Sequence, residues 1–372
     1  MREYNSSMNT EPGTDPSGPP LLALTLGDPA GIGPEIILKA WKTLSADPSF
    51  RVVVFGQAGY LQRAAHWLKA DITAIRIETP AEARSADPGV IPCLFPGPEP
   101  RVLVPPGRID PLGGQASFVC IEAAIQAALD RQVSGIVTAP ISKMAIRMGG
   151  HVFPGHTEIL ARRCGVSDFA MMLYIPPGQG VGGELGLGVV HTTLHQSLRS
   201  ALDDLSVTGI CRKIRLAHDF ATTALRHRRV RRPPRIAVAA VNPHAGELGL
   251  FGDEETTLVE PAISRARADG IECTGPLACD TLMGRAAGGE FDLVVAMYHD
   301  QGHIALKLLG MHKSVNVTLG LPLIRTSVAH GTAFEIAGTG QADCSSLLRA
   351  TGVAVDLVSG RSNQISGSPL TA

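Results

Sequence analysis

The sequence predicts an α/β fold with a mainly parallel sheet, and three observations lead to this prediction. Short apolar runs typical of buried strands alternate with longer segments in which apolar residues recur at helical spacing. Hydrophobic residues make up 44% of the 372 residues and charged residues 18%, so the chain can bury a large core. A chain of this length is typical of two domains, or of one large α/β unit.

Eight short apolar runs are the expected strands. They are rich in aliphatic residues, as strands buried on both faces of a parallel sheet are. In chain order they are LLALTL from Leu21, RVVVFG from Arg51, GIVTAP from Gly135, FAMMLY from Phe169, LGLGVV from Leu185, RIAVAAV from Arg235, FDLVVAM from Phe291 and VNVTL from Val315.

Two segments between these runs show the clearest helical pattern. In ASFVCIEAAIQAALD, residues Phe118, Ile121, Ile125 and Leu129 share one face. The segment DEETTLVEPAISRARADG, from Asp253, begins with acidic residues, which suit a helix N-terminus. In folds that alternate strands and helices, ligands bind beyond the carboxyl ends of the strands, so we expect the chemistry in the loops there.

Both ends of the chain are expected to be disordered tails. Residues 1–20 are polar and rich in Pro, Gly and Ser, and they lack the basic and apolar regions of a signal peptide. Residues 361–372 have a similar composition. Ordered structure is therefore expected from about Leu21 to about Gly360.

The charge balance and the cysteines exclude several classes of protein. The net charge is -1, which argues against a general nucleic-acid binder or a binder of acidic membranes. No apolar run approaches the roughly 18 residues needed to span a bilayer. The seven cysteines form no CxxC pair, which indicates reduced thiols in a cytoplasmic protein. The basic cluster from Arg226 to Arg235 is interpreted as a solvated helix end; a nucleic-acid patch is the alternative, but no aromatic residues accompany it.

The glycine-rich motif GDPAGIGPE follows the first expected strand, from Gly27. Its glycines permit tight turns and a close backbone approach, and Pro34 suits the first position of a helix. The spacing matches neither the dinucleotide fingerprint GxGxxG nor a P-loop. A structural turn and a ligand-binding loop are equally compatible with this motif.

Histidines follow three of the expected strands. His191 and His195 follow LGLGVV, His244 follows RIAVAAV, and His299 follows FDLVVAM together with Asp300. Any one of them alone is more often a hydrogen-bonded loop residue than a metal ligand. Because such loops gather at one sheet edge, three imidazoles can converge there. Neutral imidazoles suit Zn²⁺, Co²⁺ or Ni²⁺, whereas an all-oxygen Mg²⁺ site would need more carboxylates.

A second group of residues has the chemistry of an anion site. It comprises His156, Thr157, Lys307, Asn316 and Arg325. A cationic amine, a forked guanidinium, an amide and a hydroxyl together suit a phosphate monoester. Each residue also has an ordinary structural role open to it, such as a helix cap for Thr157 or a salt bridge for Arg325.

The segment SVAHGTAFEIAGTGQAD, from Ser327 to Asp343, contains a compact polar loop at His330, Gly331 and Thr332. Its simplest interpretation is a connection that contains a short helix.

Taken together, these motifs resemble the 4-hydroxythreonine-4-phosphate dehydrogenase family of pyridoxal phosphate (vitamin B6) biosynthesis. GDPAGIGPEI, GHTE, VNPHAGE, YHDQG, VNVTLGLPLIRTSV and HGTAFEIAG occur in the family's order. The resemblance covers about Leu21 to Leu348. It implies an isocitrate/isopropylmalate dehydrogenase-like fold of two α/β/α domains, with the active site in the cleft between them and across a homodimer interface. The domains would comprise residues 21–150 with 317–360, which carry the nucleotide loop, and residues 151–316, which carry the metal ligands and the dimer interface.

The resemblance also implies roles for individual residues. His195, His244 and His299 match the family's three metal ligands, one of which comes from the neighbouring subunit. His195 is preferred to His191 because HQSLR keeps the family's spacing from His to Arg. His156, Thr157, Lys307, Asn316 and Arg325 match its substrate-binding positions. His330, Gly331, Thr332 and Asp343 lie in a segment similar to the nucleotide loop of the decarboxylating dehydrogenases, which implies NAD as cofactor, with NADP as the alternative, beside one divalent ion (Zn²⁺, Co²⁺ or Mg²⁺) per site.

The implied reaction is oxidation of 4-(phosphooxy)-L-threonine at C3 by NAD, followed by loss of CO2 to give 3-amino-2-oxopropyl phosphate. Asp300, Asp280 and Lys307 are all candidates for the general base, and the residues do not rank them. Related enzymes that act on erythronate 4-phosphate, on threonate 4-phosphate or on an aromatic cis-dihydrodiol are the alternatives. A non-catalytic binding protein and a nucleic-acid-binding protein are alternatives from other classes.

Overall fold

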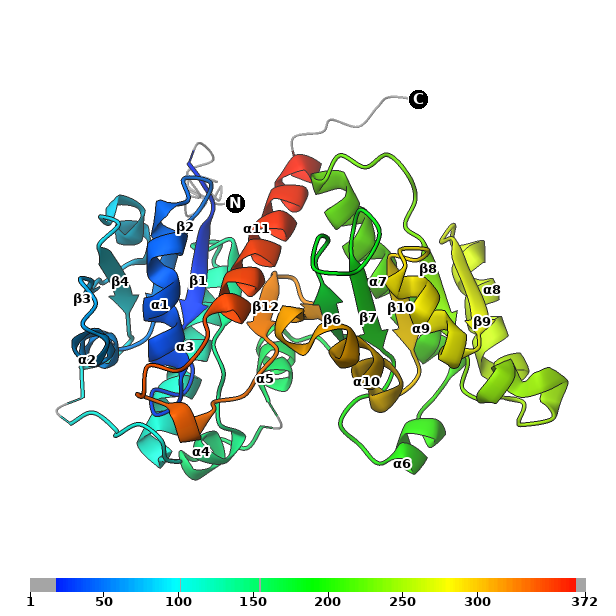
Figure 1. The fold of residues 1–372 in the computed structure, drawn as a ribbon, viewed down its shortest axis with the longest axis horizontal. Helices are drawn as coiled ribbons and strands as arrows, with labels where there is room; N and C mark the ends of the chain where they lie inside the picture. Colours follow the sequence, from blue (N-terminus) through cyan, green and yellow to red (C-terminus); the bar gives the residue numbers. More distant parts are fainter. Residues whose placement is uncertain (1–17, 101, 154, 366–372) are drawn as a thin grey trace, which may run out of the picture.

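The computed structural model describes residues 18–100, 102–153 and 155–365, which fold around one twelve-stranded sheet (Figure 1). The strand order is β3-β4-β2-β1-β5-β12-β11-β6-β7-β10-β8-β9. The strands are β1 (Leu21–Thr25), β2 (Arg51–Phe55), β3 (Thr73–Arg76), β4 (Val90–Leu94), β5 (Gly135–Thr138), β6 (Ala170–Ile175), β7 (Leu187–His191), β8 (Ile236–Ala239), β9 (Cys273–Leu277), β10 (Leu293–Ala296), β11 (Val315–Leu319) and β12 (Arg325–Val328).

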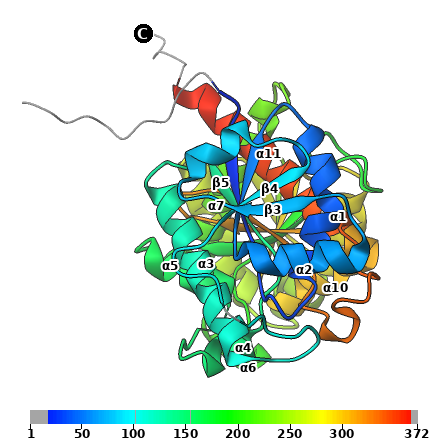
Figure 2. The same ribbon diagram turned by 90° about the vertical axis from the view of Figure 1, so that its left-hand side faces the viewer.

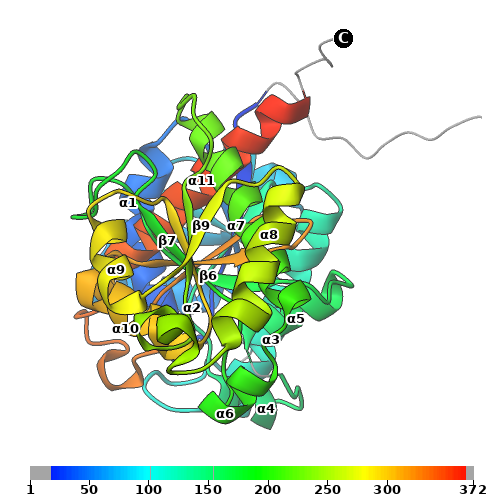
Figure 3. The same cartoon turned by 90° about the vertical axis from the view of Figure 1, so that its right-hand side faces the viewer.

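Helices cover both faces of this sheet (Figures 2 and 3). The α-helices are α1 (Gly33–Ala46), α2 (Ala58–Leu68), α3 (Pro111–Leu129), α4 (Lys143–Met148), α5 (His156–Arg163), α6 (Leu198–Asp203), α7 (Val207–His227), α8 (Glu260–Ala268), α9 (Cys279–Ala287), α10 (His299–Gly310) and α11 (Ser345–Ile365). Shorter helical segments lie at Pro80–Ser85, Pro243–Gly249, Glu255–Val259, Met311–Lys313 and Phe334–Ile336.

The predicted α/β fold with a mainly parallel sheet is confirmed. All eight expected strands are present, and antiparallel pairing is confined to β12-β11, β11-β6 and β6-β7. These antiparallel pairs join two parallel groups of strands into one continuous sheet. The predicted domain boundary between residues 316 and 317 falls within β11. Helix α11 extends to Ile365, and the rest of both expected tails, residues 1–17 and 366–372, lies outside the described residues.

The core differs between the two faces of the sheet. On one face, α1, α2, α7, α8 and α11 pack over a single hydrophobic cluster that runs through both halves of the sheet. Figure 1 shows α11 crossing between α1 and α7, and it contacts both helices. On the other face the core is divided into one cluster that contains residues of α3 and α5, and another that contains residues of α9 and α10. The apolar packing is therefore interrupted on this second face.

Helix α3 is, within the described part of the chain, the one helix long and apolar enough by composition to cross a membrane. Half of its most apolar stretch is buried in the fold, where α3 packs on β1, β2 and β5 and against α4. We expected no apolar segment of this length from the sequence, and this expectation was wrong for α3. The Gly, Ser and Gln residues of α3 interrupt its apolar run in the sequence.

The basic cluster is held by carboxylates on neighbouring elements. Arg228 bonds to Asp356 at 2.6 Å, and Arg232 makes two bonds to the buried Asp292, at 2.6 and 2.8 Å. Arg235 also contacts Asp292, at 3.1 Å. These three arginines therefore have structural roles at the end of α7 and the start of β8.

The glycine-rich motif between β1 and α1 is packed against protein backbone. A Cβ atom at Gly33 would lie 2.1 Å from the carbonyl oxygen of Leu26, and one at Gly31 would lie 2.9 Å from that of Thr332. The backbone N–H of Ile32 also donates to Thr332 O at 3.0 Å. The glycines therefore let this turn contact the segment around Thr332.

Asp28 in this turn is fully buried, and its pKa is raised to about 6 by burial, reinforced by Asp110. Its Oδ1 accepts from the N–H of Ala30 at 3.0 Å, but its Oδ2 has no partner among the described residues. The folded state thus binds this proton more tightly than the unfolded chain. The contribution of Asp28 to stability therefore falls as the pH rises from about 4 to about 6, by up to about 3 kcal/mol.

Replacing Asp28 by Asn should remove this pH dependence. At pH 8 we expect Asp28→Asn to raise the free energy of unfolding by about 1–3 kcal/mol, because the variant buries no charge, and the gain should shrink toward zero near pH 4. Chemical denaturation of both proteins at several pH values measures the difference, with the exposed Asp71→Asn as the control. A difference that stays constant from pH 4 to pH 8 would contradict this account of Asp28.

Candidate active site

A cleft of about 290 Å³ opens on the interrupted face of the sheet, between α4 and α5 on one side and α10 on the other. Its floor is formed by β6, β11 and β12, the strands that join the two halves of the sheet. All five predicted substrate-binding residues line it, namely His156, Thr157, Lys307, Asn316 and Arg325. The structure therefore brings this set together from four separate parts of the chain.

Arg325 is the most unusual side chain in the cleft, because it is a buried cation. It is 2% exposed and forms no ion pair within the described residues. Its Nη1 donates to Thr318 Oγ1 at 3.0 Å, and its Nη2 to Thr138 Oγ1 at 2.8 Å. Thr318 is its cross-strand partner on β11, and Thr138 ends the adjacent β5. Burial lowers the pKa of Arg325 to about 9, and the charge of Glu158 offsets only part of this effect.

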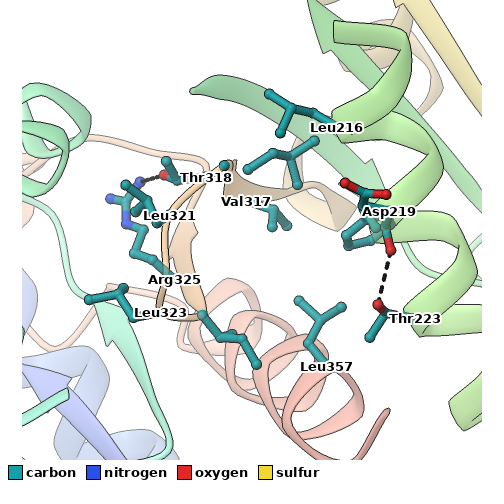
Figure 4. A pocket seen from close by; sticks show the side chains of 13 residues that line it. Leu216, Asp219, Thr223, Val317, Thr318, Leu321, Leu323, Arg325 and Leu357 are labelled. Carbon is teal, nitrogen blue, oxygen red and sulfur yellow. Dashed lines mark hydrogen bonds between the residues drawn. The ribbon is translucent and has the colours of Figure 1, made fainter. Parts of the chain in front are cut away.

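Arg325 also borders a second cavity, of about 340 Å³, at the turn of the β11–β12 hairpin between α7 and α11. Figure 4 shows its guanidinium bonded to Thr318, while Leu216, Val317 and Leu357 surround the cavity. This second cavity is largely apolar, whereas the cleft on the other side of Arg325 is polar and cationic.

Several polar atoms in the cleft are buried without a partner among the described residues. They are His156 Nε2, Asn316 Oδ1, Arg325 Nε and His330 Nε2. Burial, Arg325 and Lys143 hold the pKa of His156 well below its ordinary value, so this ring is uncharged. Buried polar groups are normally hydrogen-bonded, so a cluster of unpaired ones indicates a site for a polar ligand.

The charges of the cleft favour an anion. Lys143, Lys307 and Arg325 line it together with a single carboxylate, Glu158. Lys143 begins α4, directly after β5. A ligand with two negative charges, such as a phosphate monoester, would balance this excess of cations.

The three strands that precede the histidines are neighbours in the sheet, as the analysis of the sequence required. β7, β10 and β8 lie side by side and are parallel, so their carboxyl ends share one edge. At this edge the rings of His195 and His299 lie 5.5 Å apart, and both line the cleft. The Nδ1 of His299 bonds to Asp300 Oδ1 at 2.7 Å, which leaves its Nε2 free. A carboxylate on the far nitrogen is the usual support of a metal-binding histidine.

His244 does not join these two rings within the chain. Its loop is anchored by the buried Glu255, which accepts from the N–H groups of Val241 and Asn242 at 2.8 and 2.7 Å. Residues 244–248 then follow a left-handed path that leaves His244 exposed, 6.2 Å from the Phe251 ring. In the described part of one chain, no three histidine, cysteine or acidic side chains are grouped as a metal site would need.

His191, the alternative to His195, ends β7 and is fully buried. Its Nδ1 lies 3.2 Å from the carbonyl oxygen of Met171, and its Nε2 lies 2.9 Å from Nδ1 of His303. Both ring nitrogens of His191 are therefore engaged inside the protein. By contrast, His195 is exposed and borders both the cleft and an adjoining cavity of about 390 Å³.

The three candidate bases lie in different surroundings. Asp300 lines the adjoining cavity and bonds to His299, and Lys307 lines the cleft itself. Asp280 is exposed at the start of α9, where its Oδ1 accepts from the N–H of Thr281 at 2.9 Å, and it lines neither cavity.

The predicted nucleotide loop leads away from the cleft toward α1. His330 and Gly331 line the cleft, and the carbonyl oxygen of Thr332 binds the glycine-rich turn. Farther along, Lys39 on α1 donates to Gly340 O and Ala342 O, each at 2.7 Å. The short helix Phe334–Ile336 confirms the simple structural interpretation of this segment. Asp343 is exposed, and its Oδ1 accepts from the N–H of Ser345 at the start of α11.

Reasoning from the sequence did not single out Lys143, Glu158, Ser327 and His303, which all line the cleft. Ser327 faces Asn316 across β12 and β11. Lys143 could have been found from the sequence, because it lies in the loop region that follows the strand GIVTAP, where ligands are expected to bind. None existed for His303, whose burial depends on the packing of α10 on β7.

The chain is similar to known proteins over most of its length. The family model described as "Pyridoxal phosphate biosynthetic protein PdxA" matches residues 49–354. A D-threonate 4-phosphate dehydrogenase of Salmonella typhimurium is 45% identical over 340 residues, which cover 90% of this chain and 98% of that protein. A 4-hydroxythreonine-4-phosphate dehydrogenase of Desulfosudis oleivorans is 44% identical over 338 residues, which cover 91% and 96%.

Among solved structures, the 4-hydroxythreonine-4-phosphate dehydrogenase of Klebsiella pneumoniae superimposes with a TM-score of 0.77 at 44% identity. The match covers 91% of this chain and 99% of that one. The likeness thus extends over the whole sheet and the cleft. The chain therefore belongs to the pyridoxal phosphate biosynthetic protein PdxA family and is a dehydrogenase.

Proposed function

We propose that this dehydrogenase oxidises the C3 alcohol of a four-carbon acid that carries a 4-phosphate, with NAD as the acceptor, or NADP in its place. The observation that carries the proposal is the buried Arg325, which forms no ion pair among the described residues, in a cleft that also holds Lys143, Lys307 and one carboxylate. The leading substrate is 4-(phosphooxy)-L-threonine, whose oxidation and decarboxylation give 3-amino-2-oxopropyl phosphate for pyridoxal 5'-phosphate biosynthesis.

A second candidate substrate is the 4-phosphate of threonate or erythronate. The relative named D-threonate 4-phosphate dehydrogenase favours it, since it is as similar to this chain as the relative named for hydroxythreonine phosphate. An aromatic cis-dihydrodiol is less compatible with the cleft, because such a substrate brings no phosphate to offset the buried cation. Measuring kcat/KM of the protein for all of these compounds, with NAD and with NADP, tests the proposal; no turnover of any phosphorylated acid would end it.

The residues present fit part of a divalent metal site. His195 and His299 lie next to each other in the lining of the cleft. Burial lowers the pKa of His195, and the nearby Lys143 and His299 lower it further. The His195 ring is therefore available as a neutral ligand. Zn²⁺, Co²⁺ or Mg²⁺ bound here would supply a Lewis acid for alcohol oxidation and decarboxylation. The chain's own contribution is to hold the His299 ring through Asp300, to neutralise the phosphate with Lys307 and Arg325, and to take the alcohol proton on Asp300 or Lys307.

The third ligand, His244, would come from a second copy of the chain in a homodimer. The His244 loop exposes the large apolar side chains of Leu248, Leu250 and Phe251. On α10 beside the cleft, Leu308 is also exposed. Exposed apolar side chains grouped in this way are typical of an interface, and a second copy covering them would bring its own His244 to the site.

The cofactor would lie along the loop from His330 to Asp343, which begins in the cleft and is fixed to α1 through Lys39. NAD or NADP held there would supply the acceptor for the hydride of the alcohol. The seven free cysteines suit the reducing cytoplasm, where we propose that the enzyme acts.

Replacing Arg325 by Met should weaken phosphate binding without lowering the stability of the fold. Met has a similar volume and removes the buried charge, so the free energy of unfolding should stay within about 1 kcal/mol or rise. Affinity for inorganic phosphate should fall at least about 100-fold, because the main counter-charge is lost. Denaturation and calorimetric phosphate titration measure both effects, with the exposed Arg212→Met as the control. Unchanged phosphate affinity would remove Arg325 from the phosphate site.

Replacing His244 by Ala should reduce turnover more than about 100-fold and leave stability within about 1 kcal/mol, because the side chain is exposed. His299→Ala should be equally inactive. If the site is shared between subunits, mixing the two inactive variants and allowing subunit exchange restores activity, because each mixed dimer holds one intact site. A mixture that stays inactive although exchange is demonstrated would contradict the shared site. Mixing two batches of His244→Ala is the matched control.

Treatment with EDTA should abolish oxidation of the phosphorylated substrate, and added Co²⁺ or Zn²⁺ should restore it. The assay follows NADH formation. Full activity in the EDTA-treated, metal-free protein would remove the metal from the proposal while leaving the phosphate site intact.

A further inference from the structure

Behind the cleft, two histidines form a hydrogen-bonded pair that the proposed reaction does not use. His191 is fully buried, and His303 on α10 is 7% exposed and lines the cleft. A chain of contacts links the carbonyl oxygen of Met171 to Nδ1 of His191 (3.2 Å), and Nε2 of His191 to Nδ1 of His303 (2.9 Å).

These contacts fix the position of each hydrogen. A carbonyl oxygen only accepts, so Nδ1 of His191 carries a hydrogen. Among the described residues, no carboxylate forms an ion pair with either ring, so both rings are buried as neutral imidazoles. Nε2 of His191 is then an acceptor, and the hydrogen between the rings belongs to Nδ1 of His303. Nε2 of His303 is left with a free lone pair, and it bonds to no other described residue.

The helix places His303 between two other residues of the cleft. His299, His303 and Lys307 are spaced four residues apart on α10, so they share one face, and all three line the cleft. The His303 ring stacks on that of His299 at 3.8 Å with an interplanar angle of 15°. His303 therefore lies between the proposed alcohol end of the site and the proposed phosphate ligand.

Only two groups of the proposed substrates can donate to a lone pair there. The carboxylate and the phosphate are acceptors at neutral pH, which leaves the reacting C3 hydroxyl and the C2 substituent, a hydroxyl or an ammonium group. The reacting alcohol needs a base that keeps its proton, and a ring packed against a second neutral imidazole is unsuited to hold that charge. The C2 substituent is the donor that remains.

We propose that Nε2 of His303 accepts a hydrogen bond from the C2 substituent and makes His303 a specificity-determining residue. This inference rests on the proposed function, since it takes a phosphorylated four-carbon acid as the ligand. An acceptor whose donor is missing in the complex penalises any analogue that lacks that donor. The enzyme should therefore reject the 2-deoxy analogue, 3-hydroxy-4-(phosphooxy)butanoate, by about 10- to 100-fold in kcat/KM.

The variants His303→Asn and His303→Gln test the contact. Asn places an amide near the position of Nδ1 and so keeps the partner of His191, whereas Gln places its amide near the position of Nε2 instead. We expect His303→Asn to lower kcat/KM about 10- to 100-fold for the C2-substituted acid and less than about 3-fold for the 2-deoxy analogue. His303→Gln should recover part of the loss, and the exposed His66→Asn should change neither value. Equal losses on both substrates, or no loss on either, would overturn the proposal.

A second measurement does not depend on turnover. In the nitrogen NMR spectrum of the protein labelled in its histidines, the His303 signal, assigned by its loss in His303→Asn, should show a protonated Nδ1 and an unprotonated Nε2. Saturation with threonate 4-phosphate should shift the Nε2 resonance, and the 2-deoxy analogue should shift it much less. A protonated Nε2, or equal shifts from both ligands, would contradict the inference even if the enzyme oxidised neither acid; loss of turnover alone would instead count against the proposed function.

Discussion

The site depends on one constraint, which is that a guanidinium is buried in the sheet without an ion pair among the described residues. Arg325 is held by hydroxyl groups of Thr138 and Thr318, so the two strands that flank β12 both position it. Such a cation costs folding free energy that an anionic ligand can return on binding. β11 and β12 are among the strands that join the two parallel groups of the sheet, and the cleft that Arg325 lines opens on the face where the hydrophobic core is divided. The divided hydrophobic core and the buried guanidinium of Arg325 therefore occur at the same place in the fold.

Much of the fold could be predicted from the sequence because parallel strands buried on both faces are continuous apolar runs. The four strands that were missed break this pattern for physical reasons. β3 and β9 lie at the two edges of the sheet, where half-exposed residues dilute the apolar run, and β4 contains a proline. β12 reads RTSV, because it carries Arg325 and Ser327 into the cleft. The polar residues of β12 made the strand difficult to predict, and two of them line the site.

The candidate site was predictable in part for a similar reason. Strand ends mark the edge of the sheet where ligands bind, so His195 and His299 could be assigned to one site before their geometry was known. Lys307 and Arg325 were assigned from their chemistry and from the resemblance of the motifs to the family. The position of His244 was not accessible in this way. Its direction is set by the anchor at Glu255 and by five residues in the left-handed region, neither of which apolar spacing reveals. The pair of His191 and His303 depends on tertiary packing alone.

The most direct test of the central claim compares the phosphorylated four-carbon acid with the same acid without its phosphate. If the buried cation exists to hold the phosphate, removing that group should lower kcat/KM by at least about 1,000-fold, since remote binding energy positions the alcohol for hydride transfer. A loss of less than about 10-fold would show that the cleft does not use Arg325 in this way and would contradict the account.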